Sequence, residues 1–395
     1  MKDVWISVWI TLIIQTLVSL VVFTPPVLAP AAQPEIGVSA SAVGIATALI
    51  YLSATFGALI SSRAIARYGP MRVSQLSLVL AASGIALMAT ANIALVALGA
   101  MVIGLGYGQV TPSSTAILAD RVPQKLRAFI FSVKQTGVPL GGALAGAALP
   151  ALILNFGWQA AALVTAAMCA VVALVLQPWR AQVDQGARID QHGGLHLLEP
   201  LRLVMSHARL REMALASFTY SGMQMCLGSF LVVFLHDRIG FNLSLAGAAL
   251  SAAMIAGIAG RLLWGIAADR WQRPRFTLGI LGAGMSAGAF ATAMISPAWP
   301  IAAVMLISMV YGATAVGWNG VYLAEVAHVA PPGRAAAATG ASLAMTYSGV
   351  VVLPSLFWGI VAIGGSYRAA FIAIGCLTLW RCVSFFSDTE ARLQT

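Results

Sequence analysis

The chain has 395 residues, of which 60% are hydrophobic and only 9% are charged. Soluble domains carry about 25% charged residues, so this composition excludes a soluble globular fold. The net charge of +10 does not indicate a nucleic-acid partner, because the basic residues form short clusters between long apolar runs. We therefore expect the lipid bilayer to surround most of the chain, and no nucleic acid to bind it.

Twelve apolar segments are long enough to cross the hydrocarbon core of a membrane, which takes about 20 helical residues. They lie at 4–28, 38–61, 73–91, 94–118, 128–154, 159–177, 212–235, 244–266, 276–295, 301–324, 337–361 and 369–386. Spans three and four are separated only by a short gap around Ala91-Asn92, which predicts a tight antiparallel hairpin. One long polar stretch divides the twelve spans into two groups of six. The predicted parts are an N-terminal bundle, a cytoplasmic linker and a C-terminal bundle, at 1–177, 178–211 and 212–395.

The distribution of Lys and Arg predicts that both termini are cytoplasmic. With the N-terminus inside, eighteen basic residues fall in cytoplasmic segments and only Arg238 and Arg368 fall outside, as the positive-inside rule requires. A cleaved signal peptide is an alternative interpretation of the first span. The apolar run from Val4 to Phe23 is longer than a usual signal core. We expect a multi-pass protein of the cytoplasmic (inner) membrane.

Segments from the two halves repeat the same pattern in the same order. Residues 57–72 follow span two and residues 260–275 follow span eight, at an offset of 203 positions, with glycine and arginine at matching places. Two further pairs of segments match, at 118–120 with 323–325 and at 158–161 with 367–370. Such a repeat predicts two pseudo-symmetric six-helix bundles related by an axis along the membrane normal.

The second copy of this pattern resembles the loop signature G-x-x-x-D-R-x-G-R-R of the major facilitator superfamily. Its matching residues are Gly265, Asp269, Arg270, Arg273 and Arg275. The first copy has Ala66 where the signature has an acid. The resemblance implies an all-α membrane protein with twelve transmembrane helices in two six-helix bundles, a transporter rather than an enzyme. It also implies a gating role for a set of charged residues, namely Arg67, Arg72, Arg261, Asp269, Arg270 and Arg275.

Lys134 is a cation inside the fifth predicted span. At helical spacing it shares a face with Gly137 and Gly141, and a glycine face packs against a neighbouring helix rather than lipid. A buried charge in a span is a functional hypothesis by default, so we expect Lys134 to attract an anionic substrate. The alternative is that its flexible stem carries the ammonium to the membrane surface. For Arg261, in span eight, we expect a gating or structural role, and substrate binding is the alternative.

The resemblance implies that spans one, four, seven and ten line the substrate site. Uncharged polar or aromatic residues within these spans are candidates for substrate binding together with Lys134: Gln15, Tyr107, Gln109, Tyr220, Gln224, Trp318 and Asn319. Hydrogen bonding between helices is the alternative role of each. The acids Asp120, Glu212 and Glu325 fall at span ends, so no mid-span carboxylate is identified as a proton carrier.

No cofactor or metal is expected. The run from Gly104 to Gly108 lacks the spacing and the strand context of a dinucleotide loop, and we assign its glycines to packing of span four. Lys134 favours an organic anion, such as a carboxylate, as the substrate of a monomeric transporter that works by alternating access. The alternative is an exporter of amphiphilic or drug-like compounds, since 15 methionines and 10 tryptophans suit a forgiving pocket. A membrane sensor or membrane-embedded enzyme is the third hypothesis, without a nucleophile, metal or cofactor pattern to support it.

Overall fold

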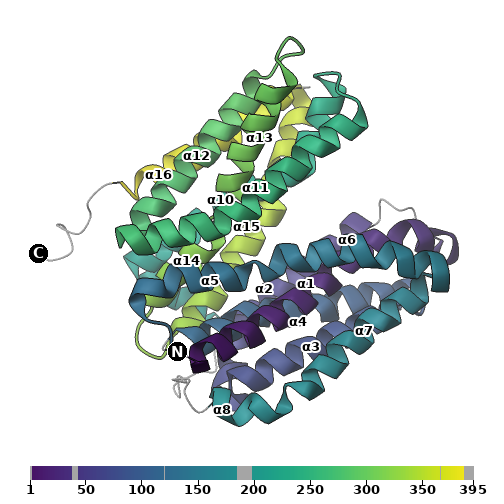
Figure 1. Cartoon of the computed structure of the whole chain (residues 1–395), viewed down its shortest axis with the longest axis vertical. Helices are drawn as coiled ribbons and strands as arrows, with labels where there is room; N and C mark the ends of the chain where they lie inside the picture. Colours follow the sequence, from purple (N-terminus) through teal and green to yellow (C-terminus); the bar gives the residue numbers. More distant parts are fainter. Residues whose placement is uncertain (1, 38–42, 120, 185–197, 365, 387–395) are drawn as a thin grey trace, which may run out of the picture. The chain divides into compact units, whose positions relative to one another are not determined.

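A computed structural model describes residues 2–37, 43–119, 121–184, 198–364 and 366–386, and in these ranges every regular element is helical. The helices up to the linker are α1 Lys2–Ile36, α2 Val43–Tyr68, α3 Pro70–Met88, α4 Ile93–Leu118, α5 Arg127–Gln135, α6 Gly137–Phe156, α7 Trp158–Val175 and α8 Arg180–Asp184. Those that follow are α9 Glu199–Ser206, α10 Ala208–Asp237, α11 Leu243–Trp271, α12 Pro274–Met294, α13 Ile301–Ala315, α14 Asn319–Val329, α15 Ala335–Gly364 and α16 Tyr367–Val383. Two short 3-10 turns, Gln124–Leu126 and Gln177–Trp179, precede α5 and α8. Figure 1 draws the helices as coiled ribbons coloured along the sequence.

The helices match the twelve predicted spans. Among the described residues, eleven segments are long and apolar enough to cross a membrane. The twelfth span corresponds to α16, whose 17 residues are the lower limit for a membrane helix. The chain is therefore an all-α, multi-pass membrane protein of the twelve-helix type.

Two of the spans are interrupted rather than continuous. Span five breaks at Thr136, between α5 and α6, and span ten breaks at 316–318, between α13 and α14. Span ten also runs on to Val329, five residues beyond its expected end. Glu325, expected at the end of that span, consequently lies within it and is 5% exposed. Asp120 lies outside the described residues.

The internal contacts divide the chain into two compact units. The first contains Met1–Pro123, Val133–Arg211 and Val326–Tyr347, and the second contains Gln124–Ser132, Glu212–Glu325 and Ser348–Thr395. Part of span five is thus grouped with C-terminal helices, and part of span eleven with N-terminal helices. The boundary at 178–211 stays a prediction, and residues 185–197 within it lie outside the described part of the chain.

The repeat in the sequence corresponds to a repeat in backbone geometry. α2 ends at Tyr68 and is followed by Gly69 with φ of 87°, and α11 ends at Trp271 and is followed by Gln272 with φ of 52°. Both positive-φ residues stand at the same position of the 203-residue offset. Their ψ angles differ, at 152° for Gly69 and 32° for Gln272, and Gln272 has the left-handed conformation that commonly ends a helix. In each half a proline then opens the next helix, at the position where its missing N–H costs least.

Glycines bring equivalent helices together in both units. A Cβ built on Gly57 of α2 would lie 3.1 Å from the carbonyl carbon of Leu105 in α4, and a Cβ on Gly260 of α11 would lie 3.1 Å from that of Ala313 in α13. Only a residue without a side chain permits this approach of two backbones. The two units therefore share one internal packing scheme, in agreement with the predicted pseudo-symmetry.

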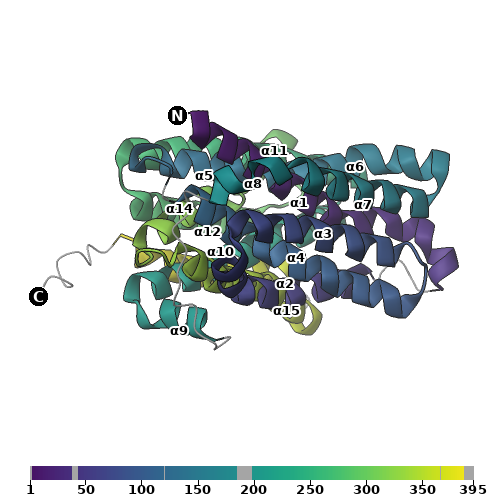
Figure 2. The same ribbon diagram turned by 90° about the horizontal axis from the view of Figure 1, so that it is seen from below.

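The hairpin between α3 and α4 forms as the sequence predicts. Ala91 turns the chain with φ of 58°, and the Asn92 side chain accepts hydrogen bonds from the N–H groups of Ala94 and Leu95 at the start of α4. Asparagine is among the preferred residues at this capping position. Figures 1 and 2 show α3 and α4 running alongside each other in the first unit.

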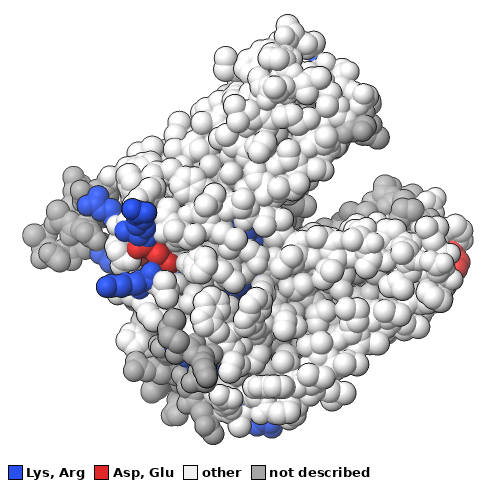
Figure 3. Space-filling model, in the orientation of Figure 1, with Lys and Arg blue, Asp and Glu red and all other residues white. Residues whose placement is uncertain are grey.

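The surface reflects a lipid environment. Large apolar side chains such as Leu154, Leu174 and Ile363 are 86%, 75% and 93% exposed. On the face shown in Figure 3, most charged side chains gather near helix ends and leave the sides of the helices largely free of charge. Water would not wet such a surface, whereas hydrocarbon does.

Candidate functional site

Lys134 lies in the last turn of α5 and is only 1% exposed. Its Nζ donates to Gln15 Oε1 at 2.7 Å, to Gln135 Oε1 at 3.1 Å and to Thr111 Oγ1 at 3.3 Å. Thr111 in turn donates to Gln15 Oε1 at 3.3 Å. The side chain is directed inward, not along the route to the membrane surface that was the alternative. We call Lys134, Gln15, Thr111 and Gln135 the lysine cluster.

The break after α5 and the glycines of α6 position this cluster. A Cβ on Gly137 would lie 3.0 Å from both Cβ and Cγ of Gln15, and a Cβ on Gly141 would lie 2.5 Å from the carbonyl oxygen of Thr16. The glycine face of span five therefore packs against α1, as expected. This close approach places the Gln15 amide next to the lysine. The lysine cluster therefore depends on the two glycines, which have no side chain to hold α1 and α6 apart, as well as on its polar side chains.

Two further candidates, Tyr107 and Gln109, lie on α4, the helix that supplies Thr111 to the lysine cluster. Gln109 donates through Nε2 to the Leu105 carbonyl oxygen at 3.1 Å, while its Oε1 is buried with no hydrogen-bond partner. Tyr107 precedes Thr111 by four residues, so both occupy one face of α4. The Tyr107 ring contacts the rings of Tyr51 and Tyr347. Neither of these two tyrosines was predicted from the sequence, because they belong to spans two and eleven, outside the four spans that the family resemblance implies.

The candidates of the second unit also come together. Gln224 Oε1 accepts from Trp318 Nε1 at 3.2 Å and from Asn319 Nδ2 at 3.3 Å. Tyr220 packs edge-on against Trp318, with ring centroids 5.7 Å apart, and its hydroxyl donates to the Leu278 carbonyl oxygen at 2.8 Å. Gln224 and Asn319 are half-buried, whereas the polar group of Tyr220 is engaged with α12.

The two units repeat one polar pairing, to which Lys134 is an addition. Gln15 of the first span accepts from Thr111 of the fourth, and Gln224 of the seventh span accepts from Asn319 of the tenth. In the first unit the same glutamine oxygen also accepts from the Lys134 ammonium. At this pairing the first unit therefore adds a positive charge beside the shared glutamine oxygen.

Arg261 occupies the interruption of span ten. Its side chain is 2% exposed, and Nε donates to the Val316 carbonyl oxygen at 3.0 Å, next to the end of α13. Trp264, one turn further along α11, donates through Nε1 to the Ala313 carbonyl oxygen at 3.1 Å. In a membrane every backbone group must be satisfied within the protein, and these two side chains bind carbonyls that the interrupted helix leaves open.

The acid of the loop signature binds the start of α5. Asp269 Oδ1 accepts from the Ala128 N–H at 3.0 Å and Oδ2 from the Phe129 N–H at 2.7 Å. These N–H groups belong to the first turn of α5, where a helix has no acceptors of its own and favours negative charge. Arg275 forms an ion pair with Glu212 at 2.6 Å. Arg270 is exposed.

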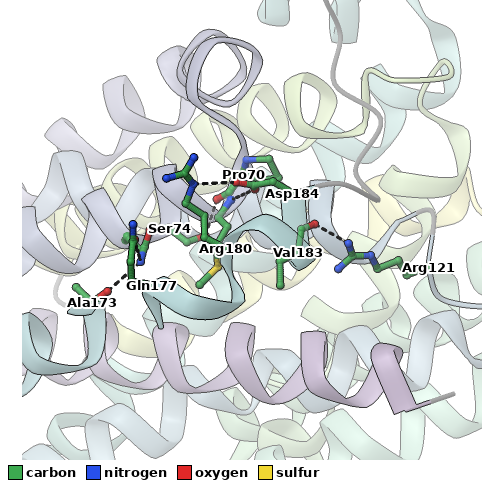
Figure 4. Close-up of polar contacts among 10 residues, drawn as sticks. Pro70, Ser74, Arg121, Ala173, Gln177, Arg180, Val183 and Asp184 are labelled. Atoms are coloured by element: carbon green, nitrogen blue, oxygen red, sulfur yellow. Dashed lines mark hydrogen bonds and ion pairs between the residues drawn. The ribbon is translucent and has the colours of Figure 1, made fainter. Parts of the chain in front are cut away.

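In the first unit an acid from elsewhere in the chain caps the equivalent loop. Asp184 of α8 accepts from the Met71 N–H at 2.8 Å and lies 3.8 Å from Arg180 (Figure 4). Arg121 binds the neighbouring Val183 carbonyl oxygen. Of the two predicted gating arginines, Arg72 is exposed, and Arg67, also exposed, lies over the ring of its neighbour Tyr68. Asp184 was not identified from the sequence because it is more than a hundred positions from the loop.

Comparison with known proteins identifies the family. The model of the Major Facilitator Superfamily matches residues 11–354. The chain belongs to the Major Facilitator Superfamily. Solved structures of this superfamily share its fold. The chain superposes on the Escherichia coli fucose:proton symporter FucP, in an alanine-substituted variant, with a TM-score of 0.74 at 15% identity, covering 98% of this chain and 99% of that one. The human organic anion transporter MFSD10 gives a TM-score of 0.75 at 18% identity, covering 97% and 99%.

Curated superfamily transporters are similar in sequence over part of the chain. A gentisate transporter of Corynebacterium glutamicum is 27% identical over 286 residues, covering 70% of this chain and 63% of the transporter. The 4-hydroxybenzoate transporter PcaK of Pseudomonas putida is 27% identical over 154 residues, covering 38% of this chain and 34% of PcaK. The matched region thus spans less than two thirds of each relative.

Proposed function

We propose that this superfamily member transports an organic carboxylate, of the aromatic acid class, across the cytoplasmic membrane by alternating access. The observation that carries the proposal is the buried Lys134 ammonium, held by side-chain oxygens of Gln15, Thr111 and Gln135. The similarity to transporters of gentisate and of 4-hydroxybenzoate supports the choice of an aromatic acid.

The lysine cluster has the properties of a carboxylate-binding site. Burying a lysine inside a span costs on the order of 3 kcal/mol, which makes the residue a functional candidate. A carboxylate forms a shorter and stronger bond to an ammonium than a neutral oxygen, such as that of Gln15 or Thr111, does. A bound carboxylate would exchange with one of these acceptors, and the amide N–H groups of the glutamines could donate to it.

In the transport cycle that we propose, α5 connects the lysine cluster at its last turn with the loop acid Asp269 at its first turn. Lys134 lies at the last turn of α5, and the first turn of the same helix donates to Asp269. A shift of Lys134 toward substrate would move α5 along its length and act on these two backbone bonds. We propose a monomer with both termini in the cytoplasm, on the basis of the basic residues between the spans.

Uptake into proteoliposomes tests the proposal. Purified protein should accumulate or exchange radiolabelled 4-hydroxybenzoate and gentisate, with unlabelled substrate inside to drive exchange. Lys134→Gln should lower the transport rate at least tenfold, while Lys134→Arg retains part of it because the charge is kept. Lys125→Gln, at an exposed lysine, is the matched control and should transport normally. Normal transport by the Lys134→Gln variant would refute the role of the lysine cluster.

A further inference from the structure

Three tyrosines from three helices meet through their rings in the first compact unit. Tyr51 of α2 and Tyr107 of α4 have ring centroids 6.2 Å apart, and Tyr347 of α15 lies 5.8 Å from each of them. All three belong to the first compact unit. Tyr51 and Tyr107 are half-buried, and Tyr347 is buried. We call these residues the tyrosine cluster.

The tyrosine cluster and the lysine cluster are connected through one face of α4. Tyr107 and Thr111 are four residues apart, hence about 6 Å along the helix axis and on the same side. Thr111 Oγ1 is 3.3 Å from Lys134 Nζ. The two clusters therefore supply the two chemistries that a benzoate needs, a cation for its carboxylate and aromatic side chains for its ring.

Glycines of α4 set the spacing of the tyrosines. A Cβ on Gly104 would lie 2.8 Å from the carbonyl carbon of Ile50, and a Cβ on Gly108 would lie 2.8 Å from that of Ala54. These glycines bracket Tyr107, and their contacts bracket Tyr51. The backbones of α2 and α4 thus approach closely at the position of the tyrosines, whose rings belong to one apolar cluster with Ala54, Ala58 and Leu343.

We propose that the tyrosine cluster binds the aromatic ring of the substrate while Lys134 binds its carboxylate. This inference rests on the proposed function and adds the determinant of selectivity for aromatic over saturated acids. Ring edges and faces from tilted and edge-on tyrosines provide the geometry that aromatic pairs prefer. A saturated ring of the same size gains burial from the cluster but not this aromatic contact.

Competition in proteoliposomes tests the inference. Uptake of labelled 4-hydroxybenzoate is measured against increasing benzoate or cyclohexanecarboxylate, which carry the same charge and have similar volume. For wild type, benzoate should inhibit at a lower concentration. Tyr347→Leu should reduce this preference by about two- to twelvefold, the range for one aromatic contact, while transport of labelled cyclohexanecarboxylate persists. Tyr347→Phe should retain the preference because the ring is kept.

A control in the second unit and a second variant complete the design. Phe357→Leu removes a ring that is stacked on Phe230, with ring centroids 4.2 Å apart. Neither residue belongs to the lysine cluster or to the tyrosine cluster, so this variant should keep the wild-type preference. If Tyr347→Leu does not fold, Tyr51→Leu, at a half-buried ring, gives the same readout. Unchanged preference in a folded tyrosine variant overturns the inference and leaves the proposed function intact. Failure of wild type to transport either acid overturns the proposed function itself.

Discussion

Replacement of Gly108 by alanine tests the close approach of α2 and α4. The added Cβ would overlap the Ala54 carbonyl and lie 2.8 Å from Ala58 N. Both atoms are backbone, so no side-chain rotation relieves the overlap and the helices must separate. Overpacking of this kind costs about 1–3 kcal/mol, against a gain of up to about 1 kcal/mol from the better helix propensity of alanine. We expect a net loss of stability and a wider Tyr51–Tyr107 separation.

The assay is equilibrium unfolding in mixed detergent micelles, followed by tryptophan fluorescence. Gly146→Ala is the matched control, because no atom lies within 4 Å of a Cβ built at Gly146. The control gains the helix propensity without the overlap, so the difference between the two variants isolates the packing cost of about 1–3 kcal/mol. Equal unfolding free energies for Gly108→Ala and Gly146→Ala would refute the packing scheme and the position of the tyrosine cluster derived from it.

Three other substitutions probe the helix ends and the interrupted span. Asp269→Ala leaves two backbone N–H groups of α5 without their acceptors, and we expect a loss of about 1–3 kcal/mol in the same unfolding assay, together with slower transport. Asp184→Ala removes a single cap from α3, and a smaller loss of about 0.5–2 kcal/mol should appear as a lower thermal midpoint; an effect larger than that of Asp269→Ala would contradict this ranking. Arg261→Met removes the donor to the Val316 carbonyl oxygen, so stability should fall by about 1–3 kcal/mol, and Arg261→Lys should restore part of it; a fully stable Arg261→Met would mean that the interruption needs no side-chain donor.

Features set by local sequence were predictable. The hairpin at Ala91-Asn92 follows from a short polar gap between two apolar runs, and the structure has a left-handed turn and an asparagine cap there. The glycines from Gly104 to Gly108 were assigned to packing, and they contact α2 and α3. The inward direction of Lys134 followed from its glycine face. In each case residues close in sequence determine the outcome.

Features set by packing between distant segments were not predictable. At the interruption of span ten, Arg261 of another helix binds the Val316 carbonyl oxygen. Hydropathy alone gave a continuous span that ended too early and placed Glu325 outside it. Asp184 accepts from the Met71 N–H at the start of α3 through a contact across 113 positions. No rule of spacing within the loop could have identified it.

The central claim is that Lys134 binds the carboxylate of the substrate, and a calorimetric binding cycle measures that interaction directly. 4-Hydroxybenzoate and its uncharged methyl ester are titrated into wild type and into Lys134→Gln. A charge-assisted hydrogen bond of about 1.5–3 kcal/mol predicts that wild type binds the acid at least about tenfold more tightly than the ester, and that the variant binds the two equally. The same preference for the acid in both proteins would contradict the account.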